Sequence, residues 1–146
     1  MTRSQTTRPA NHQRGIGLIE VLIAMLVVVI GVLGISRMQI AMLRNNQSSL
    51  LRSQASLLAY DMIDRLRADR EAALDGNYTH VLGNPAPSTS TVPADEVSAW
   101  LAAVSSALPA GTGAIAVDGN DVEVTVRWDD TRGALAPLSF TTIVEL

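Results

Sequence analysis

Glu20 is the one charged residue in an apolar run that extends from Ile16 to Ile35. On insertion scales, an acidic side chain deep in a bilayer costs about 2.5 to 3.5 kcal/mol, so a carboxylate kept at such a position indicates a function. The chemistry within its reach is the pairing of a carboxylate with a cation. The first question is therefore which cation Glu20 meets and which element positions it.

Few other residues of the chain could do chemistry. The chain has no cysteine, which excludes disulfides, a thiolate nucleophile and thiolate zinc ligands. His80 is the only histidine beyond residue 15, and no G-x-S-x-G or H-E-x-x-H spacing occurs. We therefore predict that the protein is not an enzyme and that His80 lies at the surface. Turns, rather than a calcium site, are predicted for Asp118, Asp121, Asp129 and Asp130, because their spacing is not that of a calcium loop. No metal or other cofactor is predicted.

The charge distribution disfavours nucleic acid as a partner. All eleven basic residues are arginine, and Arg3, Arg8 and Arg14 fall in the first fifteen positions, which contain no acidic residue. Without that leader the chain has eight arginines and fourteen acidic residues, a formal charge of -6. An acidic domain does not favour broad binding to a phosphate backbone, although a local arginine face could still bind one.

The apolar run is long enough to cross a membrane. Twenty residues from Ile16 to Ile35 form a helix of about 30 Å, which matches a hydrocarbon core. A secretory signal would be shorter and would end in a small-residue cleavage site. Here the helical pattern continues past Gly31 and Gly34, so the run is predicted to remain as an anchor.

The residues Arg14-Gly15-Ile16-Gly17-Leu18-Ile19-Glu20-Val21 resemble the prepilin leader motif of type IV pilins and of type II secretion pseudopilins. The likeness consists of a basic residue and a glycine before the cleaved bond, followed by an apolar run with glutamate at its fifth position. The family usually has Phe where Ile16 stands, and Ser or Thr where Gly17 stands. The resemblance implies that a membrane prepilin peptidase cuts between Gly15 and Ile16 and methylates the new amine of Ile16.

Cleavage would give Glu20 its cation. A carboxylate in the first turn of a helix is favoured by the helix dipole, and it can pair with a terminal ammonium of its own chain or of a neighbour. In a filament, pairing with a neighbour's amine would set the axial register. The alternative is a plain membrane anchor in which Glu20 merely lies among the lipid headgroups.

A long helix is expected to carry this segment into the rest of the chain. No proline occurs between Ala10 and Asn84, and Asp75-Gly76-Asn77 supplies a stop, so the helix is predicted from Ile16 to about Leu74. Its second half has an apolar stripe of Leu51, Ala55, Leu58, Met62, Leu66 and Leu74. Its polar face predicts the ion pairs Asp61 with Arg65, Arg65 with Asp69, and Arg67 with Glu71.

The first half of this helix has nothing in its own chain to pack on, so it must be buried in lipid or among other helices. Gly31 and Gly34 allow close approach of another helix or a local loosening, or are ordinary transmembrane glycines. Flanking arginines on the two sides of the run are nearly balanced. We expect the N-terminus in the cytoplasm and the C-terminus outside, an orientation that rests partly on the resemblance.

The predicted organisation is a leader of residues 1–15, a transmembrane and assembly segment of residues 16–36, a second helical half of residues 37–74, a connecting loop of residues 75–93 and a head of residues 94–146. Ala94 to Leu108 predicts a short amphipathic helix with Trp100 as a core anchor. Strict alternation from Val122 to Trp128 predicts the strongest strand, flanked by strands at residues 114–117 and 138–144. The fold class is α+β, with a long N-terminal helix packed on a small antiparallel sheet of about three strands, as in type IV pilins.

The C-terminal part of the sequence indicates which group of pilins the chain resembles. A Trp-containing helix followed by ALPAGTGAIAV and VEVTVRWDD is similar to PilV-type minor pilins. That family implies a minor subunit that primes the pilus and sits at its tip, with the prepilin peptidase, other minor pilins, the major pilin, a large tip adhesin and the inner membrane as partners. It implies an inner-membrane protein that moves to the pilus on assembly.

Three other functions stay open from the sequence. The first is a minor pseudopilin of type II secretion, which shares the leader, the long helix and the small head. The second is a subunit of a DNA-uptake pilus, in which Arg127, Arg132 or the helix arginines bind phosphates. The third is a membrane-anchored periplasmic enzyme.

Overall fold

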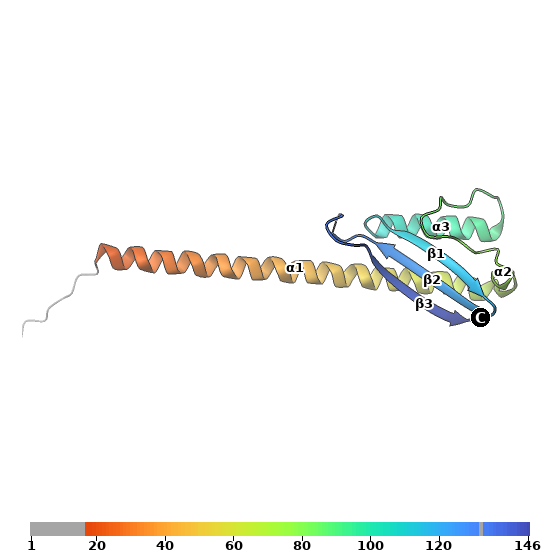
Figure 1. The fold of residues 1–146 in the computed structure, drawn as a ribbon, viewed down its shortest axis with the longest axis horizontal. Helices are drawn as coiled ribbons and strands as arrows, with labels where there is room; N and C mark the ends of the chain where they lie inside the picture. Colours follow the sequence, from red (N-terminus) through yellow and green to blue (C-terminus); the bar gives the residue numbers. More distant parts are fainter. Residues whose placement is uncertain (1–16, 132) are drawn as a thin grey trace, which may run out of the picture. The chain divides into compact units, whose positions relative to one another are not determined.

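The structure is a computed structural model that describes residues 17–131 and 133–146. The chain divides into a first unit of residues 1–43 and a second unit of residues 44–146. Gly15, Ile16, Arg132 and the three leader arginines lie outside the described residues. The elements are α1 (Leu18–Ala68), α2 (Arg70–Leu74), α3 (Val92–Ala107), β1 (Thr112–Asp118), β2 (Asp121–Trp128) and β3 (Leu138–Glu145), all shown in Figure 1.

The described part of the first unit is a single helical segment. Residues 18–43 belong to α1, and every residue from 17 to 43 is exposed. Gly31 and Gly34 both continue the helix, and a Cβ atom added at either would meet nothing within 4 Å. The segment therefore buries none of its apolar surface within the described chain.

The second unit has the predicted α+β fold. Its sheet is antiparallel in the order β1–β2–β3, and the three strands lie side by side in Figure 1. The inner face of β2 is fully buried at alternate residues, whereas β3 alternates between half-buried and exposed residues because it is an edge strand. Helix α1 contributes its apolar stripe to the same core, with Leu51, Ala55, Ala59, Met62, Ile63 and Leu66 buried.

Trp100 of α3 is the central core residue, which confirms its prediction as an anchor. It is fully buried, and its indole Nε1 donates a hydrogen bond of 2.9 Å to the carbonyl oxygen of Leu58 in α1. Gly113 of β1 lies directly against the indole, since a Cβ atom added there would come within 2.3 Å of Cη2. A large ring with one polar atom thus joins both helices to the sheet.

The long helix is interrupted before its predicted end at Leu74. Helix α1 ends at Ala68, and Asp69 has φ -122° and ψ 56°, outside the helical region. The side chain of Asp69 is held from outside the helix, because its Oδ2 lies 3.2 Å from the hydroxyl oxygen of Tyr78. The prediction of one continuous helix to Leu74 was therefore wrong, because the helix is interrupted at Asp69 and resumes as α2.

The interruption also changes the ion pairs. The predicted pair of Asp61 and Arg65 forms, with 3.0 Å between carboxylate and guanidinium. Arg67 pairs with Asp64 at 3.4 Å in place of Glu71, and the pair of Arg65 with Asp69 is not found among the described residues. Spacing of four residues brings two side chains together only on a continuous helix, and Asp69 ends that continuity.

The segment from residue 75 to 93 is less exposed than predicted. Tyr78 is fully buried, and the prediction of His80 as a surface residue was wrong, because it is only 7% exposed. The backbone of His80 exchanges two hydrogen bonds of 2.9 Å with Ile115 in β1. This one-residue bridge covers the outer edge of β1, and the burial of the imidazole lowers the pKa of His80.

Turns lie where the sequence predicts them. Asp129 Oδ1 accepts hydrogen bonds from the backbone N–H of Thr131 at 2.8 Å and from its hydroxyl at 2.9 Å. This is an aspartate turn, as expected for the Asp129 to Gly133 segment. Helix α3 begins two residues before the predicted Ala94, because Thr91 caps it by accepting a hydrogen bond from the N–H of Ala94.

Candidate assembly segment

Glu20 lies in the first turn of α1. The carbonyl oxygen of Gly17 accepts hydrogen bonds from the backbone N–H of Glu20 at 2.9 Å and of Val21 at 3.3 Å, which places Gly17 at the start of the helix. The unpaired N–H groups of a helical first turn form the positive end of the helix dipole. A carboxylate is therefore favoured at this position by the backbone itself.

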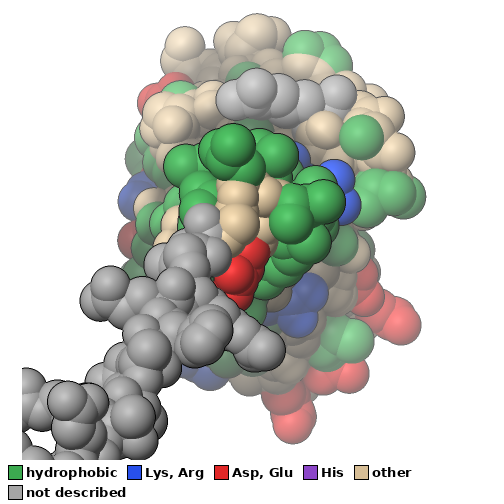
Figure 2. Space-filling model, turned by 90° about the vertical axis from the view of Figure 1, so that its left-hand side faces the viewer, with side chains coloured by type: hydrophobic (Ala, Val, Ile, Leu, Met, Phe, Trp, Pro, Cys, Tyr) green, Lys and Arg blue, Asp and Glu red, His purple; other side chains and the backbone are tan. Residues whose placement is uncertain are grey.

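The Glu20 side chain makes no hydrogen bond or ion pair within residues 17–131 and 133–146. Its surroundings on the helix are apolar, with Leu18, Ile19, Val21 and Leu22 between 43% and 86% exposed. Figure 2, which looks toward this end of the helix, shows hydrophobic side chains around α1 with an acidic group among them. The carboxylate is thus free to meet a cation from another molecule or from the leader side of the chain.

Helix α1 contains the one stretch in the described chain that is long and apolar enough to cross a membrane. Its most apolar window of 18 residues has a mean hydropathy of 3.0, and none of that window is buried. Length and composition alone allow the crossing. The exposed apolar surface must be covered by lipid or by other helices, because water does not favour an apolar face of this size.

Gly31 and Gly34 lie on the same side of α1 as Glu20. At about 100° per residue, Gly31 is displaced from Glu20 by about 20° around the helix and Gly34 by about 40°. Ala24 and Val27 fall on this side as well, so between Glu20 and Gly34 this face has three small residues and one valine. Neither glycine contacts another element of the described chain. The spacing could have been recognised in the sequence, because it needs only helical periodicity.

A small-residue face permits close approach of a second helix. Without a Cβ atom at Gly31 and Gly34, the backbone of α1 is accessible along this side. The described residues contain no group of three or more His, Cys, Asp or Glu that could hold a metal ion. What this segment can do chemically is bind a cation at Glu20 and pack against an apolar partner.

A family model for the prokaryotic N-terminal methylation motif matches residues 10–36. The matched residues include the leader side of the Gly15–Ile16 bond, Glu20 and both glycines, and they exclude the second unit. The comparisons with curated proteins and with solved structures give no match.

This match supports the assignment of the chain to the type IV pilins or pseudopilins. Proteins with this motif are structural rather than catalytic. A prepilin leader implies processing by a prepilin peptidase and assembly with other pilins. Together with the apolar helix, it suggests anchoring in a membrane.

Proposed function

We propose that this chain is a minor pilin, which prepilin peptidase processes and which co-assembles with other minor pilins to prime the type IV pilus and form its tip. The observation that carries the proposal is the position of Glu20: a carboxylate without a partner in the described chain, in the first turn of an uncovered apolar helix, inside a prepilin methylation motif. The packed α+β head of the second unit is the part that would be displayed.

Cleavage between Gly15 and Ile16 would convert an amide into an ammonium, and methylation would keep that amine cationic. Pairing with the ammonium of its own Ile16 would neutralise Glu20 within one subunit. Pairing with the ammonium of a neighbour would fix the axial position of one helix against the next. Only the second pairing favours assembly over storage in the membrane, because there the neighbour supplies the partner that the carboxylate lacks in lipid.

Close helix packing would complete the assembly contact. A neighbouring helix that brings its amine to Glu20 must also lie along the side of α1 that contains Gly31 and Gly34. Small residues on that side let the two backbones approach and add dispersion contacts along the helix. Glu20 would thus supply the register, and the two glycines would supply the close approach.

The proposed location follows from this sequence of events. Before assembly the chain would be a single-pass protein of the inner membrane, with the leader in the cytoplasm and the second unit outside. After assembly it would be part of the pilus, in contact with other minor pilins, the major pilin and a large tip adhesin.

The mass of the mature N-terminus tests the proposal. Full-length protein is isolated from its own cells and from cells lacking the prepilin peptidase, and the N-terminal peptide is identified by mass spectrometry. We expect an N-methylated Ile16 in the first sample and the uncut leader in the second. An uncut leader in cells with active peptidase would contradict the proposal and would favour a plain membrane anchor.

A deletion separates the pilus from the secretion alternative. If the chain is a minor pilin that primes assembly, cells without it should have fewer pili. If it is a type II secretion pseudopilin, such cells should have normal pili but should fail to export the enzymes that the system secretes. A DNA-uptake subunit predicts normal pili and steeply salt-dependent DNA binding by the purified chain. Absence of DNA binding at low salt would exclude the DNA-uptake function.

A further inference from the structure

A pocket of about 300 Å³ lies in the second unit between the segment 80–86, α3 and the beginning of β1. Its walls consist mainly of small residues, among them Gly83, Ala86, Ala102, Ser105 and Gly111. Among the described residues that line it there is no arginine, aspartate, glutamate, phenylalanine, tyrosine or tryptophan, and His80 is the only one with a titratable side chain. The composition does not suit a phosphate or another ion, and the small walls admit a polypeptide backbone.

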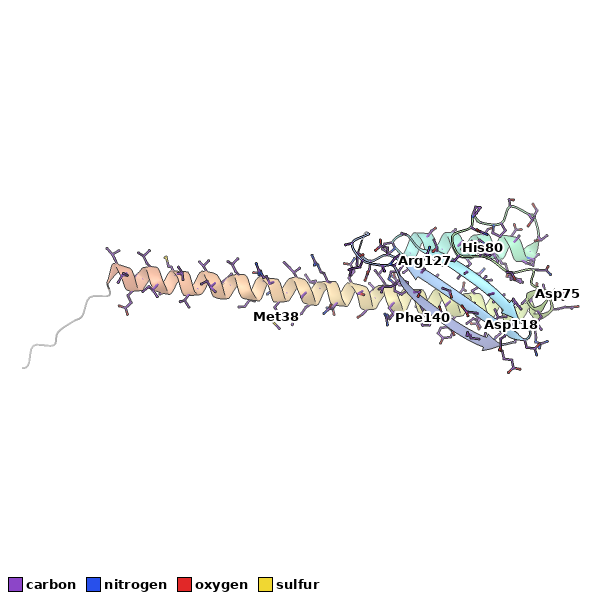
Figure 3. The ribbon with its side chains drawn as sticks, in the orientation of Figure 1. Met38, Asp75, His80, Asp118, Arg127 and Phe140 are labelled. Carbon is purple, nitrogen blue, oxygen red and sulfur yellow. The ribbon has the colours of Figure 1, made fainter. Side chains whose placement is uncertain are left out.

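The pocket lies at the outer edge of β1, at the point where strand pairing stops. His80, which is labelled in Figure 3, pairs through its backbone with both the N–H and the C=O of Ile115 on this edge. In an antiparallel strand, alternate residues direct their N–H and C=O groups to the same edge, so those of Gly113 face it as well. Continued pairing would bring Leu82 opposite Gly113.

The chain turns away before Leu82 can pair. The backbone N–H of Asn84 donates to the carbonyl oxygen of Val81 at 3.1 Å, and Gly83 has a φ of +86°, a left-handed conformation that glycine adopts without strain. Gly113 is therefore left with an edge N–H and an edge C=O that no described residue meets. These are one donor and one acceptor in the spacing that a β-strand presents to its neighbour.

These polar groups are not simply open to water. Gly113 is a buried residue, and both it and Thr112 line the pocket. The hydroxyl oxygen of Thr112 is buried and has no hydrogen-bond partner in the described chain. Since buried N–H, C=O and hydroxyl groups are almost always paired in native proteins, the floor of the pocket lacks the partner for which its groups are arranged.

We propose that this pocket is a docking slot for an extended peptide segment of a partner subunit, with small side chains, whose backbone adds to the sheet at Gly113. The partner would donate an N–H to the Gly113 carbonyl and accept a hydrogen bond from the Gly113 N–H, as in other cases of strand addition. Burial lowers the pKa of His80 and so keeps the wall of the slot uncharged at neutral pH.

The free edge of β3 is the competing place for strand addition. By the same alternation, Ser139, Thr141 and Ile143 direct their backbone groups away from β2. All three residues are exposed, so water can pair those groups. The edge of β1 differs because Gly113 is a buried residue, in the lining of a pocket that it shares with α3 and the segment 80–86. A partner therefore gains more at Gly113, where it replaces missing hydrogen bonds.

The test follows the amide signal of Gly113 by NMR in the isotope-labelled full chain in detergent micelles. The probe is the blocked peptide acetyl-Ala-Gly-Ala-amide, and the matched probe replaces its glycine by sarcosine, which removes one N–H. We expect a saturable downfield shift of the Gly113 amide, with a Kd on the order of 0.1 to 1 mM for a ligand of this size. The sarcosine peptide should bind about tenfold more weakly, because one backbone hydrogen bond is lost.

Two substitutions on α3 provide the protein controls. Ala102→Trp places a large side chain in the slot and should abolish the shift, whereas Ala103→Trp alters the next exposed residue, which does not line the pocket, and should leave binding unchanged. If Ala102→Trp disturbs signals beyond the slot, Ser105→Leu fills the same pocket from the next turn and replaces it.

Four outcomes would overturn the proposal: no saturable shift at about 10 mM peptide, equal affinity of the two peptides, unchanged binding to both slot-filling variants, or shifts confined to Thr141 and Ile143. The last outcome would assign strand addition to β3, and the first would leave water as the occupant of the pocket. The proposal uses no residue of the assembly segment, so its failure would leave the proposed function standing.

Discussion

The two units of this chain contain similar apolar residues, but only the second unit buries them within the described chain. In the first unit Leu26 and Leu33 are each 60% exposed, and apolar residues surround the helix on all sides. In the second unit Met62 and Leu66 of the same helix are fully buried, and apolar residues keep to one stripe. An apolar stripe indicates a partner within the chain, whereas an apolar surface on every side of a helix indicates partners outside it.

The comparison also separates the two kinds of glycine. A Cβ atom added at Gly31 or Gly34 would meet nothing in the described part of the chain, whereas Gly113 lies against the indole of Trp100. Glycine therefore leaves room for a partner from outside the described chain in the first unit, and it allows close packing within the chain in the second. Substitutions in matched pairs, one in each unit, can break or sharpen this difference.

The largest effect is expected from removal of a core ring. Trp100→Ala should lower the free energy of unfolding of the second unit by about 3 to 5 kcal/mol, because it leaves a cavity and removes the indole hydrogen bond to the Leu58 carbonyl. The measurement is thermal unfolding of the full chain in detergent, followed by near-UV circular dichroism of Trp128. Leu26→Ala is the control in the first unit and should leave this transition unchanged; equal losses would refute the comparison.

A glycine pair gives the next effect. Gly113→Ala forces a Cβ atom against buried ring carbons at 2.3 Å and should destabilise the second unit by about 1 to 3 kcal/mol. Gly31→Ala adds a methyl group in open space and should leave the second unit unchanged while it favours the helix. The same unfolding assay checks both. A neutral Gly113→Ala would show that the close approach of β1 and α3 is not needed.

Removal of the charge of Glu20 tests the first unit alone. We expect Glu20→Gln to leave leader cleavage and the unfolding of the second unit largely unaffected. The amount of this chain in purified pili should fall at least about tenfold, which corresponds to about 1.4 kcal/mol. Immunoblots of pili and of membranes measure the ratio. Incorporation at the level of the unchanged chain would count against the proposed register role.

Replacement of Gly15 separates processing from assembly. A bulky residue such as Gly15→Leu should block leader removal and leave the leader attached, since the resemblance assigns the cleaved bond to this position. Gly17→Ser, which introduces a residue usual at this position in prepilins, is the matched control and should be cleaved normally. Cleavage of Gly15→Leu at the normal rate would show that the bond lies elsewhere.

The smallest effect is expected from a change of pH on the stability of the second unit. The pKa of His80 is lowered in the folded chain, so the unfolded chain binds more protons as pH falls through the ordinary histidine range near 6.5. The second unit should therefore lose stability as the pH falls below about 7, by less than about 1.4 kcal/mol per pH unit. His80→Asn should reduce this slope in unfolding measurements; an identical slope would exclude His80 as its source.

Much of the fold could be predicted because its signals are local. The alternation from Val122 to Trp128 corresponds to the buried face of β2, and the apolar spacing of α1 corresponds to its buried stripe. The ion pair of Asp61 with Arg65 follows from one turn of helix. Each of these patterns depends on neighbours within a few residues, where the geometry of a helix or a strand determines which side chains share a face.

The misses have a common cause in contacts between distant segments. Tyr78 lies within 3.2 Å of both Asp69 and Glu96, at the end of α1 and in α3, and its burial beside the two carboxylates raises its pKa. His80 is buried because its backbone pairs with Ile115, thirty-five residues later. One-residue contacts of this kind leave no periodicity in the sequence.

The sequence by itself determined the prepilin motif, the place of Glu20 in it and the apolar length of the first unit, because these depend on order and spacing along one chain. Only the tertiary structure decided where α1 is interrupted, which residues of the segment 75–93 are buried, and that the edge of β1 is left open at Gly113. Those features arise where segments far apart in the chain meet, and the shape and polarity of each segment decide which groups of the other find a partner.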